Sequence, residues 1–82
     1  MKKDIKHFNE QGERHGYCEY YYTNDKVWFK GNYVNGNKHG YWEWYNDNGN
    51  PCFKANYDNG RQIGLSEKYN NDGELIEQIF YS

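Results

Sequence analysis

The sequence predicts an all-β fold, an antiparallel meander of about seven strands in a single domain that spans residues 1–82. Its motifs recur every 24 residues, and a period of this length is typical of one supersecondary unit repeated side by side. Within each repeat, aromatic and polar residues alternate over short runs, as in half-buried strands. Asn-Gly and Asp-Gly dipeptides separate the runs and supply the positive φ that hairpin turns require. The unit is therefore predicted to be a β-hairpin.

The 24-residue period places three repeats at about residues 9–32, 33–56 and 57–81, and leaves residues 1–8 as a capping strand. Residues that recur at the same place in each repeat are expected to satisfy the geometry of the hairpin itself. Five series define the period: Gly12/Gly36/Gly60, Gly16/Gly40/Gly64, Glu19/Glu43/Glu67, Tyr21/Tyr45/Tyr69 and Tyr33/Tyr57/Tyr81.

The expected strands follow this pattern in chain order. The first is expected to be half of an incomplete repeat that acts as a cap. No helix is expected, because residues 6–14 show no helical periodicity and Gly12 interrupts them. The later strands are separated by turns rich in Asn, Asp and Gly. The expected spans are 3–9, 16–22, 27–34, 40–46, 51–58, 64–70 and 75–81.

The composition limits both the core and the function. Aromatic residues make up 21% of the chain and apolar residues only 35%, so the rings must form the core. The net charge of −2 disfavours non-specific binding to nucleic acid or to an anionic membrane. No apolar run approaches the roughly 18–20 residues of a membrane span, and no apolar region follows the first four residues. We therefore expect a cytoplasmic protein without a signal peptide.

The second repeat contains the motif Tyr33-x-Asn35-Gly36-x-x-x-Gly40-x-Trp42-x-x-Tyr45-x-x-x-Gly49. The outer copies depart from it, with Cys18 and Ser66 in place of Trp42, and Asp25 in place of Gly49. The motif resembles the variant of the MORN (membrane occupation and recognition nexus) repeat found in many small bacterial proteins, and the resemblance covers residues 9–81. It implies a sheet or solenoid of β-hairpins without shared catalytic residues, and relatives described as antitoxin-like or as interaction modules.

Successive side chains of a strand point to opposite faces of the sheet. If every loop keeps odd-numbered residues on one side, the sheet has an odd face and an even face. Odd-numbered residues would form a face that repeats closely between copies, and this face is predicted to be the core. Even-numbered residues would form a variable face with an aromatic cluster and two lysines, as partner-binding surfaces often have. Alternatively, these rings only cover the second side of a thin sheet. The candidate partner-binding residues are Tyr20, Tyr22, Trp28, Lys30, Trp42, Trp44 and Lys54.

The series Glu19, Glu43 and Glu67 falls on the predicted core face. Buried carboxylates need hydrogen-bond donors, and tyrosine hydroxyls or turn amides are the candidates. A β-bulge that turns each glutamate toward solvent is the alternative. Paired carboxylates also occur in glycosidases, but equivalent spacing in every copy indicates a structural role.

His15, His39 and the two cysteines are the remaining candidates for chemistry. The histidines precede turn glycines in equivalent places, which favours turn residues over a metal or acid–base site. Cys18 and Cys52 fall on strands three steps apart, on the order of 14 Å, so two free thiols are predicted. We therefore expect no catalytic residue, no metal and no cofactor.

The last expected strand, residues 75–81, is apolar and lies at the edge of the sheet. An uncovered edge of this kind pairs with another strand. We expect a homodimer through this edge, or addition of a strand from a partner protein.

These patterns favour a non-enzymatic protein that binds another protein and neutralises it, as an antitoxin or a phage-type inhibitor would. One alternative is a repeat that binds carbohydrate or choline, because aromatic cages suit quaternary ammonium groups. Another is a single-strand nucleic-acid binder that stacks bases on its rings, although the net charge disfavours it.

Overall fold

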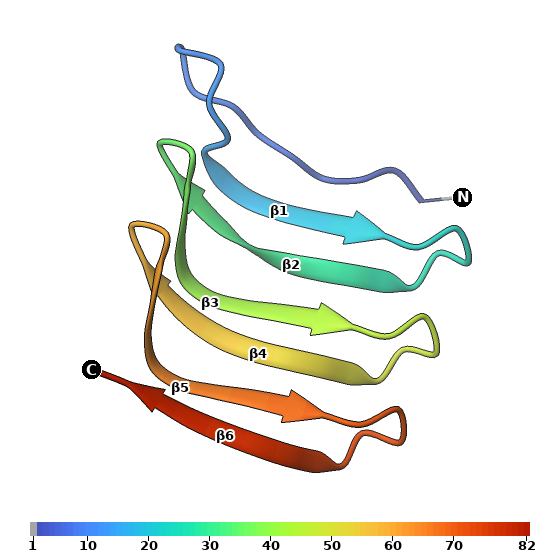
Figure 1. The fold of residues 1–82 in the computed structure, drawn as a ribbon. Helices are drawn as coiled ribbons and strands as arrows, with labels where there is room; N and C mark the ends of the chain where they lie inside the picture. Colours follow the sequence, from blue (N-terminus) through green and yellow to red (C-terminus); the bar gives the residue numbers. More distant parts are fainter. Residues whose placement is uncertain (1) are drawn as a thin grey trace.

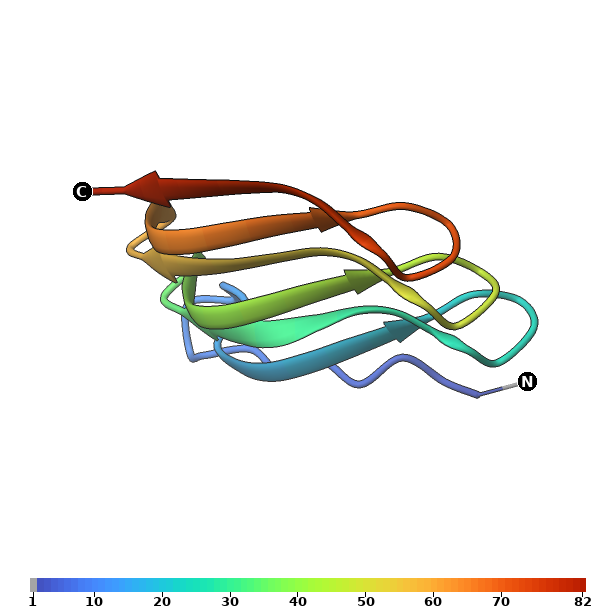
Figure 2. The same cartoon turned by 90° about the horizontal axis from the view of Figure 1, so that it is seen from below.

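The computed structural model describes residues 2–82 and shows one antiparallel sheet of six strands in the order β1-β2-β3-β4-β5-β6 (Figure 1). The sheet is a single layer with extents of 40 × 39 × 10 Å (Figure 2), and the described residues form no helix. The predicted all-β meander is confirmed, with six strands instead of seven. The strands are β1 (Gly16–Tyr21), β2 (Val27–Val34), β3 (Asn37–Tyr45), β4 (Pro51–Asp58), β5 (Arg61–Tyr69) and β6 (Leu75–Tyr81).

The expected first strand, 3–9, is not a strand in the structure. The segment runs beside β1 (Figure 1) but pairs only through two isolated bridges, Ile5 with Glu19 and Phe8 with Arg14. Ile5 and Glu19 exchange two backbone hydrogen bonds of 2.8 and 2.9 Å. Charged residues dominate the segment and both of its apolar side chains stay exposed, so little burial stabilises a longer ladder.

Two kinds of turn join the strands, one at each end of the sheet. The two-residue turns Asn35-Gly36 and Asn59-Gly60 have φ of 48° and 88°, and of 50° and 86°, as type I′ hairpins require. The longer turns at the other end each lie beside a β-bulge, and one residue in each has positive φ. Asp25 takes this position with φ of 68°, where later copies have glycine. Aspartate tolerates the left-handed region, so this departure from the repeat preserves the turn.

Hydrogen bonds between successive hairpins connect these turns along both ends of the sheet. At one end, Asn24 Nδ2 donates to Asp47 O at 2.7 Å, and Asn48 Nδ2 donates to Asn71 O at 2.9 Å. At the other end, the Gly36 amide donates to Arg14 O at 2.8 Å. Each repeat therefore binds the next through its turns as well as through its strands.

The second glycine series bends the strands. β3 turns sharply along its length (Figure 1), and Gly40 within it has a φ of +82°. The pairing with β2 shifts at this bend, because Lys30 pairs with Glu43 whereas Asn32 pairs with His39. Glycine adopts a positive φ at no steric cost, which explains why the series recurs every 24 residues.

The predicted division into odd and even faces is wrong. A two-residue turn pairs the residues on either side of it, Val34 with Asn37, so an even position on one strand faces the same side as an odd position on the next. The pairs Cys18–Gly31 and Trp42–Ala55 show the same change of parity. One face, which we call the aromatic face, therefore carries even residues of β1, β3 and β5 and odd residues of β2, β4 and β6. The alternation breaks at the β-bulges, where the extra residue Trp28 lies beside Phe29 on this face.

Candidate functional site

A row of stacked rings crosses the aromatic face from β1 to β4. Tyr20 stacks on Phe29 with ring centroids 4.6 Å apart, and Trp44 packs against Phe53 at 5.3 Å. The register places Phe29 opposite Trp44, which joins the two halves of the row. All four rings are half-buried, so the row remains accessible from one side of the sheet.

Trp42 lies on the same face as this row and packs between its rings and the backbone of the sheet. Its side chain is 0% exposed, and its indole lies across Gly31, where an added Cβ would come within 2.2 Å of the ring. Trp42 Nε1 donates to Asn32 O at 3.0 Å, and the Tyr33 ring meets the indole edge-on at 5.0 Å. Trp42 is therefore a core residue and not part of an accessible surface.

Trp28 extends the aromatic face at its turn end and is 44% exposed. Its ring lies 4.9 Å from Phe29 and 5.8 Å from Tyr22. The Tyr22 hydroxyl donates to Tyr45 O at 2.6 Å, which fixes this end of the cluster. Trp28 is thus the large aromatic side chain that protrudes most from the row.

Cations flank the aromatic row. Arg14 lies 5.1 Å from the Tyr20 ring centroid, and Lys38 lies 5.5 Å from that of Trp42. Among the paired strand residues on this face, the single carboxylate is Glu77, and it pairs with Lys68 at 3.6 Å beyond the end of the row. The part of this face over β1–β4 therefore combines aromatic rings with the cations Arg14 and Lys38, although the whole chain has a net charge of −2.

The opposite face carries a ladder of five charged residues and one glutamine across the six strands. Registered pairs run in the order Glu19, Lys30, Glu43, Lys54, Glu67 and Gln78. Lys30 Nζ lies 3.6 Å from Glu43 Oε1, and alternating charges opposite one another stabilise a sheet. Farther along the ladder, Gln78 Nε2 donates to Glu67 Oε2 at 3.0 Å, and Lys54 lies over the Tyr69 ring at 5.1 Å.

Each glutamate of the ladder accepts hydrogen bonds from tyrosine hydroxyls, which confirms one of the two predictions for this series. Tyr41 and Tyr45 donate to the two oxygens of Glu43 at 3.1 and 2.9 Å. In the first repeat, Tyr17 and Tyr21 donate to Glu19 in the same way. Burial and the hydrogen bond to Glu43 raise the pKa of Tyr45 to about 12. The glutamates therefore have a structural role in each repeat.

These hydrogen bonds predict how stability depends on pH. The hydroxyls of Tyr17 and Tyr21 lower the pKa of Glu19 below its ordinary value of 4.5. A carboxylate with a lowered folded-state pKa stabilises the protein above pH 4.5, and this contribution disappears as the pH falls through the lowered pKa. Glu19→Gln should therefore cost about 1 kcal/mol or less at neutral pH and progressively less in acid. Urea midpoints measured between about pH 7 and pH 3 check this, with the exposed Glu10→Gln as the control. A loss that is the same at every pH would contradict it.

The structure separates the candidate residues predicted from the sequence. Tyr20, Trp42 and Trp44 lie on the aromatic face, and Tyr22 and Trp28 lie at its turn end. Lys30 and Lys54 lie on the opposite face, because the hairpin turns change the parity. The prediction also missed four residues that the turns bring to the aromatic face: Phe29, Phe53, Tyr33 and Tyr57. The two-residue Asn35-Gly36 turn was the signal that could have placed them.

The histidines and cysteines behave as structural residues. His15 Nδ1 accepts a hydrogen bond from the Asn35 amide at 3.1 Å, and His39 Nδ1 lies 3.8 Å from Asp58 Oδ1. Cys18 and Cys52 are both free, as predicted, and burial raises the pKa of each thiol. A raised pKa lowers the thiolate fraction and hence the reactivity. Within residues 2–82, no group of three or more His, Cys, Asp or Glu residues could hold a metal ion.

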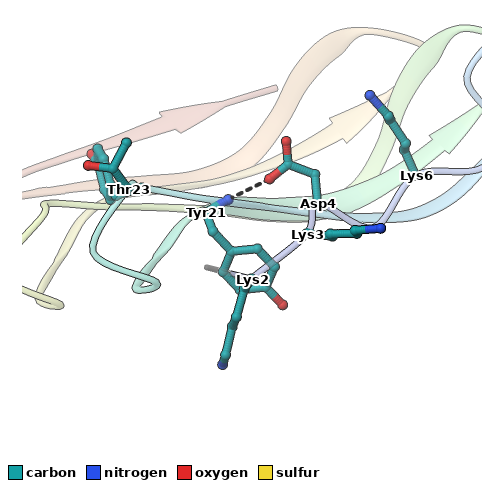
Figure 3. Close-up of a pocket in the computed structure, with 7 residues that line it drawn as sticks. Lys2, Lys3, Asp4, Lys6, Tyr21 and Thr23 are labelled. Atoms are coloured by element: carbon teal, nitrogen blue, oxygen red, sulfur yellow. Dashed lines mark hydrogen bonds between the residues drawn. The ribbon is translucent and has the colours of Figure 1, made fainter.

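An open depression of about 400 Å³ lies between the N-terminal segment and the end of β1 (Figure 3). Asp4 Oδ1 accepts a hydrogen bond from the Tyr21 amide at 3.0 Å and holds the segment in place. Lys2 and Lys6 point away from each other (Figure 3), and they lie over the Tyr21 and Tyr20 rings, on opposite faces of β1. Because the lysines diverge, this depression does not gather positive charge around one anion.

Comparison with known families agrees with the three hairpins. The MORN repeat variant matches residues 14–35, 38–59 and 62–82, which is most of the chain. The chain belongs to this family. No curated protein and no solved structure matches the chain closely enough to report.

Membership identifies the general class of the molecule. MORN repeats are non-catalytic units that are generally associated with binding to proteins or membranes. Within the described residues, no helix has the length and apolar character needed to cross a membrane. The family matches begin and end close to the strand pairs β1–β2, β3–β4 and β5–β6, so each MORN repeat here corresponds to one hairpin.

Proposed function

We propose that this MORN repeat protein binds another protein through the aromatic face and thereby inhibits it, as an antitoxin or a phage-type inhibitor does. The observation that carries the proposal is the accessible row of rings over β1–β4, flanked by Arg14 and Lys38. Tryptophan, tyrosine and arginine are the usual energetic anchors of protein interfaces. On the opposite face, Glu43 is already paired with Lys30 and accepts hydrogen bonds from two tyrosine hydroxyls. That face therefore has fewer free polar groups for a partner to bind.

The charge of the aromatic face indicates what the partner presents. Arg14 and Lys38 lie over the rings, and none of the paired strand residues of β1–β4 on this face is a carboxylate. A complementary surface would place apolar side chains against the row and one or two carboxylates against these cations. The partner is therefore a protein with an acidic, partly apolar patch.

Two exposed aromatic residues on opposite faces test the proposal. Trp28, which is 44% exposed, belongs to the aromatic cluster, and Tyr41, which is 49% exposed, lies on the ladder face. Trp28→Ala should weaken binding of a partner captured from the native host by about tenfold or more, as hot-spot residues do. Tyr41→Ala is the matched control and should change the dissociation constant less than about twofold. Calorimetry with the purified partner measures both.

Inhibition is tested on the same pair of proteins. If the partner is an enzyme or toxin, titration with this protein should abolish its activity at one binding equivalent, and Trp28→Ala should require a proportionally higher concentration. Equal losses for Trp28→Ala and Tyr41→Ala, with unchanged circular dichroism, would argue against the aromatic face. Binding without any loss of the partner's activity would refute inhibition and leave an assembly module.

A further inference from the structure

A groove lies on the ladder face, opposite the aromatic face, between the first two repeats. It has a volume of about 290 Å³ and is lined by Tyr17 of β1, by residues of β2 and by Tyr41 of β3. The two tyrosines are 38% and 49% exposed. Gly31 and Asn32 of β2 line the groove between them. Two exposed aromatic rings therefore flank a hollow that the strand between them leaves open.

Hydrogen bonds hold both rings in place. The Tyr41 hydroxyl donates to Glu43 Oε2 at 3.1 Å, and the Tyr17 hydroxyl donates to Glu19 in the same way. Each acceptor lies two residues along the same strand, so the hydroxyls are already engaged and the ring carbons are left to contact a ligand. Because the rings are positioned in advance, a ligand that binds between them loses little free energy in ordering them.

Polar groups of both signs line the same groove. Lys30 Nζ lies 3.6 Å from Glu43 Oε1, and the two side chains are 36% and 17% exposed. Asn32 is exposed beside them, and its amide can both donate and accept hydrogen bonds. A cationic ligand would be repelled by Lys30, and an anionic ligand would be repelled by Glu43. The groove therefore suits a neutral ligand that exchanges hydrogen bonds in both directions.

The spacing of the strands limits the thickness of that ligand. β1 and β3 lie on either side of β2, so the two tyrosines extend from strands about 9.6 Å apart, twice the usual strand spacing. Carbon contacts of about 3.5–4 Å with each ring leave about 2 Å between the outer atoms of the ligand. A flat base or aromatic ring is too thin to contact both tyrosines, whereas a puckered ring with C–H groups on both faces is thick enough.

We propose that this groove binds one pyranose ring of a neutral saccharide, held between Tyr17 and Tyr41. The C–H faces of the sugar contact the two rings, and its hydroxyls exchange hydrogen bonds with Lys30, Asn32 and Glu43. The volume of about 290 Å³ is at the lower end for ligand pockets, which fits a single sugar unit. The site lies on the face opposite the aromatic row, so it does not depend on the proposed protein partner.

The next gap along the sheet has one tyrosine fewer. Leu65 of β5 stands 24 residues after Tyr41, so the gap over β4 lies between one aromatic and one aliphatic side chain. Lys54 and Asn56 of β4 repeat the lysine and the asparagine of the groove over β2. The two gaps therefore share their polar residues and differ in one ring, which makes the second gap a comparison within the same molecule.

Titration with the neutral disaccharides cellobiose, maltose and N,N′-diacetylchitobiose, followed by heteronuclear NMR, tests the site. At least one of them should shift the amide signals of Gly31 and Asn32, with a dissociation constant below about 10 mM. Glycerol at the same concentration of hydroxyl groups should not shift them, and choline should bind more weakly because its cation faces Lys30. The proposal would be overturned by the absence of shifts with all three disaccharides up to their solubility limits. Equal shifts with glycerol, or tighter binding of choline, would overturn it as well.

Substitutions of Tyr41 separate its ring from its hydroxyl. Tyr41→Ala should weaken binding of the disaccharide by about fivefold or more, because one of the two ring contacts is lost. Tyr41→Phe keeps the ring without the hydrogen bond to Glu43 and should change the dissociation constant less than about twofold. Trp28→Ala, on the aromatic face, should leave saccharide binding unchanged, the reverse of its expected effect on a protein partner. A larger loss for Trp28→Ala than for Tyr41→Ala would place the saccharide on the aromatic face and refute the groove.

Leu65→Tyr tests whether a second ring is enough to make a site. It supplies the missing ring over β4, so the amide signals of Ala55 and Asn56 should also shift and the binding stoichiometry should double. Leu65 is 39% exposed, so the substitution does not disturb a packed core. Leu65→Met, which adds no ring, is the matched control and should keep the original stoichiometry. A folded Leu65→Tyr variant with unchanged stoichiometry would show that the paired rings do not bind the sugar.

Discussion

Trp42→Ser is expected to destabilise the protein by about 3–5 kcal/mol, which is the usual cost of removing a large buried aromatic side chain. The Trp42 side chain is completely buried, and its ring contacts Phe29, Tyr33 and Trp44 at centroid distances between 5.0 and 6.1 Å. A single-layer sheet has no second layer that can collapse into the space left behind. Urea unfolding followed by far-ultraviolet circular dichroism measures the loss.

Trp28→Ser is the matched control for this prediction. Trp28 is a tryptophan on the same face but is 44% exposed, so its removal creates no enclosed cavity. We expect a cost below about 1.5 kcal/mol, at the lower end for burial of a large side chain. Similar costs for Trp42→Ser and Trp28→Ser would show that the Trp42 ring does not anchor the sheet.

Gly31→Ala is the second substitution with a large expected effect. An alanine Cβ at this position would lie 2.2 to 2.6 Å from three atoms of the Trp42 ring, so the indole must move. Overpacking of this kind typically costs about 1–3 kcal/mol. The Trp42 Nε1 hydrogen bond to Asn32 O ties the ring in place, which favours the upper part of that range. The change in urea midpoint, at constant slope, gives the value.

The double variant Gly31→Ala, Trp42→Ser tests the explanation. The next pair of repeats already contains this combination, because Ala55 of the second repeat and Ser66 of the third occupy the equivalent positions and both are buried. Once the indole is gone, the added methyl should fit, so the double variant should be more stable than the sum of the single effects by about 1–3 kcal/mol. Additive effects would mean that the strain lies elsewhere in the strand.

The local features of the fold could be predicted from the sequence because they depend on neighbouring residues. Asn35-Gly36 and Asn59-Gly60 predict two-residue hairpins, and their φ angles are those of type I′ turns. The glycine series that includes Gly40 is explained by positive φ at the bend, and β6 lies at an edge as expected. The resemblance of Tyr33–Gly49 to a MORN repeat is confirmed by the family match.

The candidate surface was predicted only in part, because side-chain direction depends on the number of residues in each turn. Trp44 and Tyr20 share a face as predicted, but Lys30 lies opposite them and pairs with Glu43. Trp42 is of a residue type that is common in interfaces. Its neighbours along the chain do not show that its ring packs against the backbone of Gly31. The expected strand 3–9 failed for a similar reason, since its alternation was not matched by burial.

The sequence by itself determined the hairpin unit, its 24-residue period, the positions of the turns and the family, because each depends on backbone preferences that a few adjacent residues express. Only the tertiary structure decided which side of the sheet each residue faces, which tryptophan is buried and how far the rings extend. These properties depend on register across strands, and one residue more or less in a turn or bulge moves a whole strand's side chains to the other face.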